Sequence, residues 1–514
     1  MADKTQNDRF ETKGEEVVKI IHEVNSASYT LRLTAHKDEM ELRCSFKPGS
    51  DCSKFSEEVF HSILVDAGVS AEIDNDAVSK LCYQASRKRT QKNILIAVGT
   101  KPVKGDDQRI DFLAKSSSEN VIKFEEFDEK KDYHNLNLFD NVEQGELIAE
   151  VFWATDGTPG VNGLGQHVEA MRGLMFKRER RAGRNVTMSE DGSQFFADVS
   201  GRILYDQFRG VIEVSDTYEI RGDVGYKTGN IDFVGHVIVN GDVSDTYNIK
   251  AGLNIRINGH VGNSRIECGG DIDLIGVDGK NEARVLCAGN FKGRYVHEAG
   301  IEAQGNIEIV KEAVNANLNS EKVIYATKGS IIGGDSIALC GIEVNEVGSD
   351  AQVPTKLTAG ISYILRQRVA LLKADIVVLE DSITKIEKKI NPFVTNPRNL
   401  LSLNDDGRKQ IQELTEEFKE TVSKKEQMAI ELKEIRDSSR EDANPMINIL
   451  AAVNPRVSLN LGTSCEVTTQ RKVLHCTVLE NSLKGGLRFT SVYRLSSKAK
   501  DIESEIADRE SQQI

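Results

Sequence analysis

Five side chains in the glycine-rich middle of the chain could act as acids, bases or metal ligands: Asp271, Asp273, Asp278, His260 and His297. Enzymatic cleavage of carbohydrates needs two carboxylates that flank the scissile bond. Asp271 and Asp273 alternate at the start of an expected strand, where turn and surface roles dominate, and neither histidine has a carboxylate or cysteine at metal-ligand spacing. We therefore predict no catalytic residue, no metal site and no cofactor, with a carbohydrate-active enzyme as the weaker alternative.

Residues 154–167 form a glycine-rich segment that could be compared with a phosphate-binding loop. Gly163 and Gly165 begin a GxG pattern, but residue 168 is valine, so the GxGxxG motif is incomplete. No GxxxxG frame is followed by the lysine and hydroxyl residue of a P-loop. The sequence predicts a structural loop here rather than a nucleotide site.

Two clusters of basic residues stand out in a chain whose formal net charge is −14. An acidic surface repels nucleic-acid phosphates, and neither cluster is interleaved with the aromatic side chains on which single-stranded bases stack. We expect no nucleic-acid partner. The first cluster is a candidate surface for a protein partner, and ordinary solvated surface is the alternative for both. The first consists of Arg87, Lys88, Arg89 and Lys92, and the second of Lys177, Arg178, Arg180, Arg181 and Arg184.

The cysteines and the hydrophobic pattern indicate a reducing, aqueous compartment. None of the eight cysteines belongs to a CxxC pair, so we expect free thiols. No apolar stretch approaches the ~18 residues of a membrane span, and the start of the chain lacks the pattern of a signal peptide. These features predict a cytoplasmic protein without a membrane span.

The glycines of residues 215–350 recur at a fixed period. This region holds 21 of the 41 glycines and no proline, and Gly222, Gly241 and Gly259 are almost evenly spaced. A second set, which begins at Gly235 and precedes short alternating strands, continues with nearly the same spacing at Gly252. A period near 18 with short β-branched strands is typical of a β-solenoid, in which each coil pairs with the next. The sequence predicts a right-handed parallel β-helix.

Residues 361–390 and about 405–438 show the heptad periodicity of coiled-coil helices. Pro392 and Pro397 lie between them and should break the helix. We predict an antiparallel hairpin, and because Thr421 and Lys425 weaken the second seam, apolar surface should remain for a second copy, with a dimer favoured. The predicted interface residues are Leu365, Val369, Leu372, Ile376, Leu379, Ile383, Ile386, Ile411, Leu414, Phe418, Met428 and Leu432.

These patterns divide the chain into six parts. We expect a partly disordered extension (1–54), an α+β domain (55–185), the β-helix (186–359), the hairpin (360–440), strands that return to the β-helix (441–496) and a charged tail (497–514). The predicted fold class is mainly β with α: a parallel β-helix with an inserted antiparallel coiled-coil hairpin and an α+β N-terminal domain. Because such irregular elements carry much of protein recognition, the N-terminal part is where we expect partners to bind, and a structural cap for the solenoid is the alternative.

Several short motifs in this order resemble those of the bacterial flagellar assembly protein A family, once catalogued as a domain of unknown function. The segment with Thr158, Pro159, Gly160 and Gly163 is similar to its TPGxxG loop. Residues 229–235 match its GNIDFxG motif, and residues 341–349 resemble the exit of its solenoid. The resemblance covers roughly residues 55–495, and the basic run at 177–184 departs from it, because the family has a proline-rich turn there.

The resemblance implies a non-enzymatic scaffold or regulator of flagellar assembly or placement that acts through protein–protein contacts. Expected partners are flagellar, polar-landmark or cytoplasmic regulatory proteins, with recruitment to the cell pole. The β-helix is also similar in kind to those of bactofilin polymers and of the septum-site inhibitor. A polymer-forming or pole- and division-site positioning scaffold is therefore the alternative, and it rests on analogy of fold alone.

Overall fold

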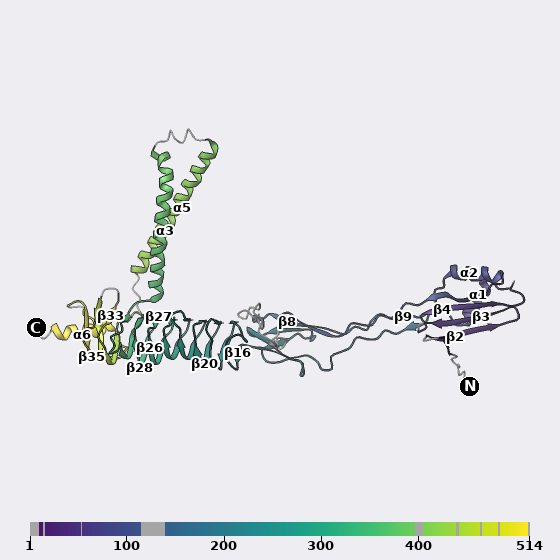
Figure 1. The fold of residues 1–514 in the computed structure, drawn as a ribbon, viewed down its shortest axis with the longest axis horizontal. Coiled ribbons are helices and arrows are strands. Elements are labelled where there is room, and N and C mark those ends of the chain that lie inside the picture. Colours follow the sequence, from purple (N-terminus) through teal and green to yellow (C-terminus); the bar gives the residue numbers. More distant parts are fainter. Residues whose placement is uncertain are drawn as a thin grey trace. The chain divides into compact units, whose positions relative to one another are not determined.

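The computed structural model describes residues 10–13, 16–36, 38–52, 54–114, 139–395, 404–437, 442–462, 465–481 and 484–511. Contacts within the chain define two units, whose elements are labelled in Figure 1. Unit 1 comprises Met1–Leu113, Glu146–Ala197 and Tyr205–Ile212. Unit 2 comprises Ala114–Gly145, Asp198–Leu204 and Glu213–Ile514.

Unit 1 begins with a five-stranded antiparallel sheet, the head. Its order is β1 (Phe10–Lys13), β2 (Glu16–Asn25), β3 (Tyr29–His36), β4 (Glu41–Pro48) and β5 (Gln91–Val98). Helices α1 (Glu57–Asp66) and α2 (Asn75–Ser86) lie between β4 and β5 in the chain and share an apolar core with the sheet, in which Leu33 and Phe46 meet Phe60. The expected boundary at residue 54 therefore lies within the head, between β4 and α1. Strands β2, β3 and β4 lie in the part of the chain that was expected to be a partly disordered extension, and residues 1–9 lie outside the described residues.

A ribbon of three extended segments, 99–108, 155–163 and 166–175, continues unit 1. Backbone bridges join Thr100 to Val161 and Val103 to Thr158, and the amide of Gly105 donates to the carbonyl of Met171 at 2.9 Å. Beyond the ribbon, β6 (Arg109–Phe112), β8 (Leu147–Phe152), β13 (Gln194–Ala197) and β12 (Val186–Met188) form an antiparallel sheet. Unit 1 also contains β9 (Gly160–Val161), β10 (His167–Val168) and β11 (Arg181–Ala182). Strand β7 (Asn141–Val142) belongs to unit 2, and the division between the units falls within β14 (Gly201–Asp206) and β15 (Val211–Ser215).

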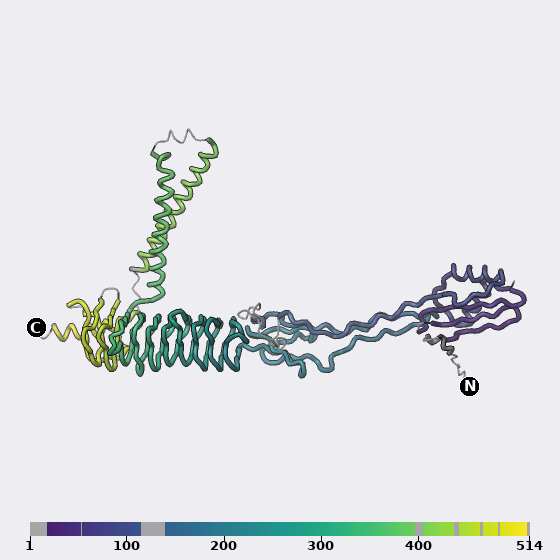
Figure 2. The backbone as a smooth tube through the Cα atoms, viewed as in Figure 1, coloured from purple at the N-terminus to yellow at the C-terminus, as the bar shows by residue number. Residues whose placement is uncertain are grey.

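Unit 2 is a parallel β-solenoid whose coils stack one on the next (Figure 2). The first sheet contains β16 (Thr217–Ile220), β18 (His236–Val239), β20 (Ile255–Val261), β22 (Ile272–Asp278), β24 (Phe291–His297), β26 (Ile307–Val314), β28 (Ile324–Ile332) and β30 (Ile342–Val347). The second contains β17 (Ile231–Phe233), β19 (Ile249–Ala251), β21 (Arg265–Cys268), β23 (Arg284–Cys287), β25 (Gly300–Ala303), β27 (Asn317–Ser320), β29 (Gly334–Ala338) and β31 (Thr355–Ala359). This confirms the predicted β-helix, although its parallel coils begin at residue 217, later than the expected 186.

Stacked apolar side chains fill the solenoid. In the first sheet the register aligns Val237, Ile255, Ile272 and Phe291 in one inward column. All four are nearly inaccessible to solvent, so each coil buries its apolar side chains on the coil before and the coil after it. The period of the sequence arises because the same inward positions must recur once in each coil.

The coiled-coil hairpin is inserted between two coils. Helix α3 (Tyr363–Thr395) follows β31, and α5 (Asp405–Asp437) leads back to β32 (Ile447–Val453) and β33 (Val457–Leu461). Strand β32 pairs in parallel with β30, and β33 with β31, so the solenoid resumes after the insertion. Pro392 lies inside α3, which ends three residues later, so the expectation that it breaks the helix is wrong; Pro397 lies outside the described residues.

Different elements close the two ends of the solenoid. At the C-terminal end, β34 (Cys465–Thr468), β35 (Val473–Glu480) and β36 (Leu487–Thr490) pair antiparallel, and α6 (Ala499–Ser511) packs beside β35. At the N-terminal end, the ring of Phe139 contacts those of Tyr218 and Phe233 at 4.8 and 5.7 Å between centroids. Antiparallel strands and aromatic rings thus occupy the edges on which further parallel coils would otherwise stack.

Candidate interaction surfaces

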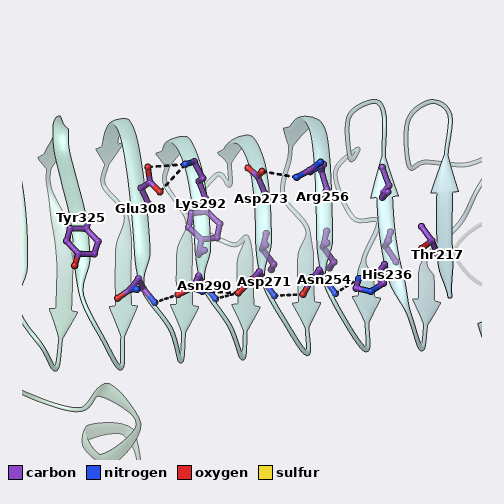
Figure 3. A pocket seen from close by; sticks show the side chains of 16 residues that line it. Thr217, His236, Asn254, Arg256, Asp271, Asp273, Asn290, Lys292, Glu308 and Tyr325 are labelled. Atoms are coloured by element: carbon purple, nitrogen blue, oxygen red, sulfur yellow. Dashed lines mark hydrogen bonds and ion pairs between the residues drawn. The ribbon is translucent and has the colours of Figure 1, made fainter. Parts of the chain in front are cut away.

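A shallow groove of about 670 Å³ runs over the first sheet of the solenoid, across β18 to β28 (Figure 3). Its floor includes the outward side chains of successive strands, which the register brings into one column. Arg256 pairs with Asp273 at 3.8 Å, and Lys292 pairs with Glu308 at 3.0 Å. The column therefore alternates in charge from coil to coil.

A polar ladder forms one edge of this groove. The side-chain oxygen of Asn254 accepts from the amide of Asp271 at 2.9 Å, and Asp271 accepts from the amide of Asn290 at 2.7 Å. Asn290 repeats the contact with the amide of Asn306 at 2.9 Å. Asp271 is therefore a structural cap, and Asp273 is engaged by Arg256, so two of the three carboxylates that the sequence offered for catalysis hold neighbouring coils together.

The two histidines singled out from the sequence belong to one cluster of side chains around Tyr295. The hydroxyl of Tyr295 contacts Nδ1 of His260, the ring of Tyr295 lies 5.0 Å from that of His297, and Nε2 of His297 is 3.2 Å from Oε1 of Glu312. Tyr295 reaches across β22 because Gly276 lies beneath its ring, where a Cβ would collide with it. Burial, with the nearby carboxylates of Asp278 and Asp242, raises the pKa of Tyr295.

This cluster gives both histidines partners that their spacing in the sequence did not reveal. Sequence reasoning missed it because His260 and Tyr295 are 35 residues apart, which is two coils of the solenoid. The repeat of the solenoid could have indicated this contact, since residues 260, 276 and 295 occupy equivalent positions on successive coils. Among the described residues, no group of three His, Cys, Asp or Glu is placed to hold a metal ion.

In the hairpin, α3 packs against α5. The predicted interface residues, from Leu365 to Leu432, are all buried or half-buried in the described hairpin. Arg368 pairs with Glu431 at 2.7 Å and Lys425 with Glu380 at 2.9 Å, which fixes an antiparallel register. Lys425, expected to weaken the seam, thus makes a cross-helix ion pair.

A second apolar row lies on the outer surface of α3. Ile364, Leu371 and Val378 recur every seven residues and are 41%, 59% and 64% exposed, and Val377 beside them is 64% exposed. We call these four residues the α3 stripe. It was missed because the heptad pattern was assigned only to the inner seam.

A buried carboxylate fastens α3 to the solenoid. Glu321, which is 7% exposed, accepts a hydrogen bond from the hydroxyl of Ser362 at 2.7 Å and from the amide of Ile364 at 3.2 Å. The pair caps the first turn of the helix, because Ser362 in turn accepts from the amide of Leu365. Arg366 adds an ion pair to Asp335 at 3.6 Å. The base of the hairpin is therefore held at two neighbouring coils.

The TPGxxG residues 158–163 belong to the ribbon and also contact the head. Thr158 and Gly160 contact the segment around residues 100–103 through their backbones. Asn162, only 5% exposed, accepts at its side-chain oxygen from the amides of Leu164 and Gln166 and donates to Glu39 at 3.3 Å. Gly163 donates to the carbonyl of Glu39 at 2.8 Å, which joins the loop to the turn before β4. These contacts fit the predicted structural loop, and Pro159 follows the paired Thr158.

Two protein-family models match this chain. The model of the Flagellar Assembly Protein A beta solenoid domain matches residues 216–484, and that of the Flagellar Assembly Protein A N-terminal region matches residues 31–207. The chain belongs to the flagellar assembly protein A family. No curated protein and no solved structure matches it. The solenoid match begins one residue before β16, where the parallel coils begin.

Within this flagellar assembly protein A family member, the two basic clusters have different surroundings. Arg87, Lys88, Arg89 and Lys92 are exposed at the end of α2 and the start of β5, and Arg87 stacks over Tyr83 at 4.5 Å. In the second cluster, Arg180 lies over the ring of Phe176 at 3.8 Å, and Arg178 donates to the carbonyl of Phe208. Lys177, Arg181 and Arg184 are exposed.

The cysteines of the family member that the structure describes are free, and several are buried. Burial raises the pKa of Cys44 and of Cys287 to about 12, so both remain protonated thiols near neutral pH. Cys287 and Cys268 are aligned in an inward column of the second sheet. They act there as small apolar side chains. No helix among the described residues has the length and apolarity that crossing a membrane requires.

Proposed function

We propose that this chain is a non-enzymatic cytoplasmic scaffold in flagellar assembly, which acts by binding other proteins. Membership of the flagellar assembly protein A family supports the flagellar setting. One observation carries the scaffold mechanism: the α3 stripe is exposed on a hairpin whose base is bonded to one coil of the solenoid through Glu321. A rigid body that presents an apolar row at a fixed point suits the assembly of partners.

The α3 stripe has the spacing of a helix-docking surface. Exposed apolar side chains that form a row, rather than scattered single residues, mark interaction sites. A row that repeats every seven residues along a helix matches the apolar face of another helix. The occupant we propose is the hairpin of a second copy, so that two hairpins form a four-helix bundle and the chain is a homodimer.

Other partners are proposed for the head. The exposed cluster of Arg87, Lys88, Arg89 and Lys92 offers positive charge on a chain that is acidic as a whole, and a protein partner with an acidic surface would fit it. Flagellar, polar-landmark and regulatory proteins are the candidates, and recruitment to the cell pole would follow from binding a landmark there. The capped ends of the solenoid argue against the alternative of an end-to-end polymer, since β35 and α6 cover the last coil.

The experiment replaces stripe residues in the full chain and measures both assembly and flagellation. Leu371→Lys and Val378→Lys put a charge in the proposed interface. Thr384→Lys is the matched control, because residue 384 is exposed on the same helix and lies about 120° around it from Val378. We expect each stripe variant to weaken dimerisation at least about tenfold, the effect of ~1.4 kcal/mol, and to reduce the number of flagellated cells. Sedimentation of the purified chain and counting of flagella are the readouts.

The two parts of the proposal fail separately. If deletion of the whole protein leaves flagellation and motility unchanged, the flagellar role is wrong. If the stripe variants sediment as the parent chain does while deletion abolishes flagella, the role stands and the docking surface lies elsewhere. Thr384→Lys should change neither readout, and a defect equal to that of Leu371→Lys would mean that any added charge on α3 is harmful.

A further inference from the structure

The outward column of the first sheet has an order that is complementary to itself. From coil to coil it contains Ile238, Arg256, Asp273, Lys292, Glu308 and Tyr325. When this six-residue segment is reversed, every charged position changes sign and Ile238 exchanges places with Tyr325. The column continues beyond the segment with Glu219 before Ile238 and Glu343 after Tyr325. Between 49% and 63% of each charged side chain is exposed, so the internal ion pairs leave these groups open to a partner.

We propose that this face is an interface with a second copy of the chain, whose solenoid lies antiparallel to the first. The two-fold axis runs parallel to the strands, between β22 and β24. Arg256 then faces Glu308 of the other copy, Asp273 faces Lys292, and Ile238 faces Tyr325. Each cation then pairs with one carboxylate of its own copy and one of the second copy. The result is a network of ion pairs, whereas an isolated exposed pair would contribute little to the free energy of association.

The geometry of the fold favours one-to-one contacts in this arrangement. Strands in both copies repeat at ~4.8 Å, because both are parallel sheets, so the columns stay in step over their whole length. The polar ladder beside the column is also compatible, since Asn254 comes opposite Asn306 and Asp271 opposite Asn290. No like charges meet between Ile238 and Tyr325. Just beyond them Glu219 comes opposite Glu343, and each of these two carboxylates accepts a hydrogen bond from an asparagine of its own copy, Asn240 and Asn448.

Other registers are poorer. If the axis passes through β22 or β24, Asp273 or Lys292 meets its own copy and like charges oppose each other. If the axis moves one coil toward the C-terminus, Arg256 faces Glu343 and Lys292 faces Glu308. Asp273 then faces Tyr325 and loses its cation, and Ile238 faces Asn448. The axis between β22 and β24 is the one that matches both cations and both uncharged side chains.

The small area of the proposed interface implies weak association. The column from Ile238 to Tyr325 spans about 24 Å at the spacing of adjacent strands, and a strip of this length is smaller than the ~800 Å² per partner of a stable interface. Association should therefore depend on concentration and fall as salt screens the charges. It goes beyond the proposed function, since it needs neither the hairpin nor a flagellar partner.

The test is a charge-exchange experiment on the full chain, in low and high salt. R256E alone and E308R alone set like charges opposite each other twice in a homodimer, whereas a mixture of the two variants restores every pair between the copies. All chains also carry Leu371→Lys, so that association through the hairpin does not mask the effect. We expect each variant alone to associate at least about tenfold more weakly than the chain with Leu371→Lys alone, and the mixture to recover most of that loss. The assay is sedimentation with one variant fluorescently tagged at its N-terminus, and circular dichroism confirms that each variant is folded.

The outcomes assign or overturn the contact. Rescue of R256E by E343R instead of E308R would place the axis one coil away and overturn the register stated above. A parent chain that stays monomeric up to about 0.5 mM, where contacts of this size associate, would overturn the interface. So would association of the parent chain that Leu371→Lys alone abolishes, because it would then belong to the hairpin.

Discussion

The solenoid and the ribbon are both rich in glycine, and they use it for different purposes. In the solenoid, coils bury side chains on one another, and residues such as Val237 and Phe291 stack in columns that repeat with the coil. In the ribbon, three backbones lie so close that glycine is required where they meet. A Cβ on Gly105 would collide with the carbonyl of Thr155, and one on Gly173 with that of Asp106.

The difference teaches how stability is distributed. The solenoid owes its stability mainly to buried apolar surface, so the loss of one core side chain affects the neighbouring coils. The ribbon has many exposed apolar side chains, among them Val103, Met171 and Leu174, and is held by backbone hydrogen bonds and close backbone contact. We therefore expect the solenoid to lose stability when a buried side chain is shortened, and the ribbon to lose stability when a glycine gains a Cβ.

The largest effect should come from removing a core ring of the solenoid. Phe291→Ala deletes a ring that is 1% exposed, and it should lower the free energy of unfolding of the solenoid by about 3–5 kcal/mol. Denaturant unfolding, followed by hydrogen exchange of β22 to β26, measures it. Phe208→Ala is the matched control, because Phe208 is 89% exposed. Equal losses for the two variants would show that the stacked column contributes little.

The next effect should come from adding one methyl group to the ribbon. Gly105→Ala should destabilise the ribbon by about 1–3 kcal/mol, because the new Cβ meets a backbone atom that cannot rotate away. Faster hydrogen exchange over residues 99–108 and 155–175, with the solenoid unchanged, is the expected result. Gly222→Ala is the control, since a Cβ there has no atom within 4 Å. Normal exchange in Gly105→Ala would contradict the close backbone packing.

The same contrast explains how far the sequence could be interpreted. The β-solenoid was predictable because inward positions must recur in each coil, and the hairpin was predictable because heptads place Leu372 and Ile386 on one seam. The ribbon was not, because its glycines mark crossings of distant segments and have no period. Gly105 and Thr155 are far apart in the chain, and no sequence pattern in either segment indicates that the two are in contact.

The candidate surfaces were predictable to a smaller extent. Arg256, Asp273, Lys292 and Glu308 follow one another at close to the period of the solenoid, so that period could have aligned them in one column. Whether their side chains point outward depends on the local strand register, which the bulges of these strands shift. The α3 stripe could have been found from Ile364, Leu371 and Val378, but only with the inner seam already assigned.

The smallest effect compares two asparagines that link segments in the two regions. Asn162 is buried where the ribbon contacts the head. Asn162→Ala removes the acceptor of the amides of Leu164 and Gln166 and the donor to the carboxylate of Glu39. Because unsatisfied buried groups cannot recover their hydrogen bonds from water, the free energy of unfolding should fall by about 1–3 kcal/mol.

Asn254 makes one exposed bond of the ladder, to the amide of Asp271. Asn254→Ala should lower the free energy of unfolding by about 0.5–1.5 kcal/mol or less, since water replaces the lost acceptor. The measurement compares the increase in hydrogen exchange of the Leu164 and Gln166 amides in Asn162→Ala with that of the Asp271 amide in Asn254→Ala. If Asn254→Ala proves the more damaging, the ladder is a principal support of the solenoid, and the contrast between a solenoid held by buried side chains and a ribbon held by backbone contacts is wrong.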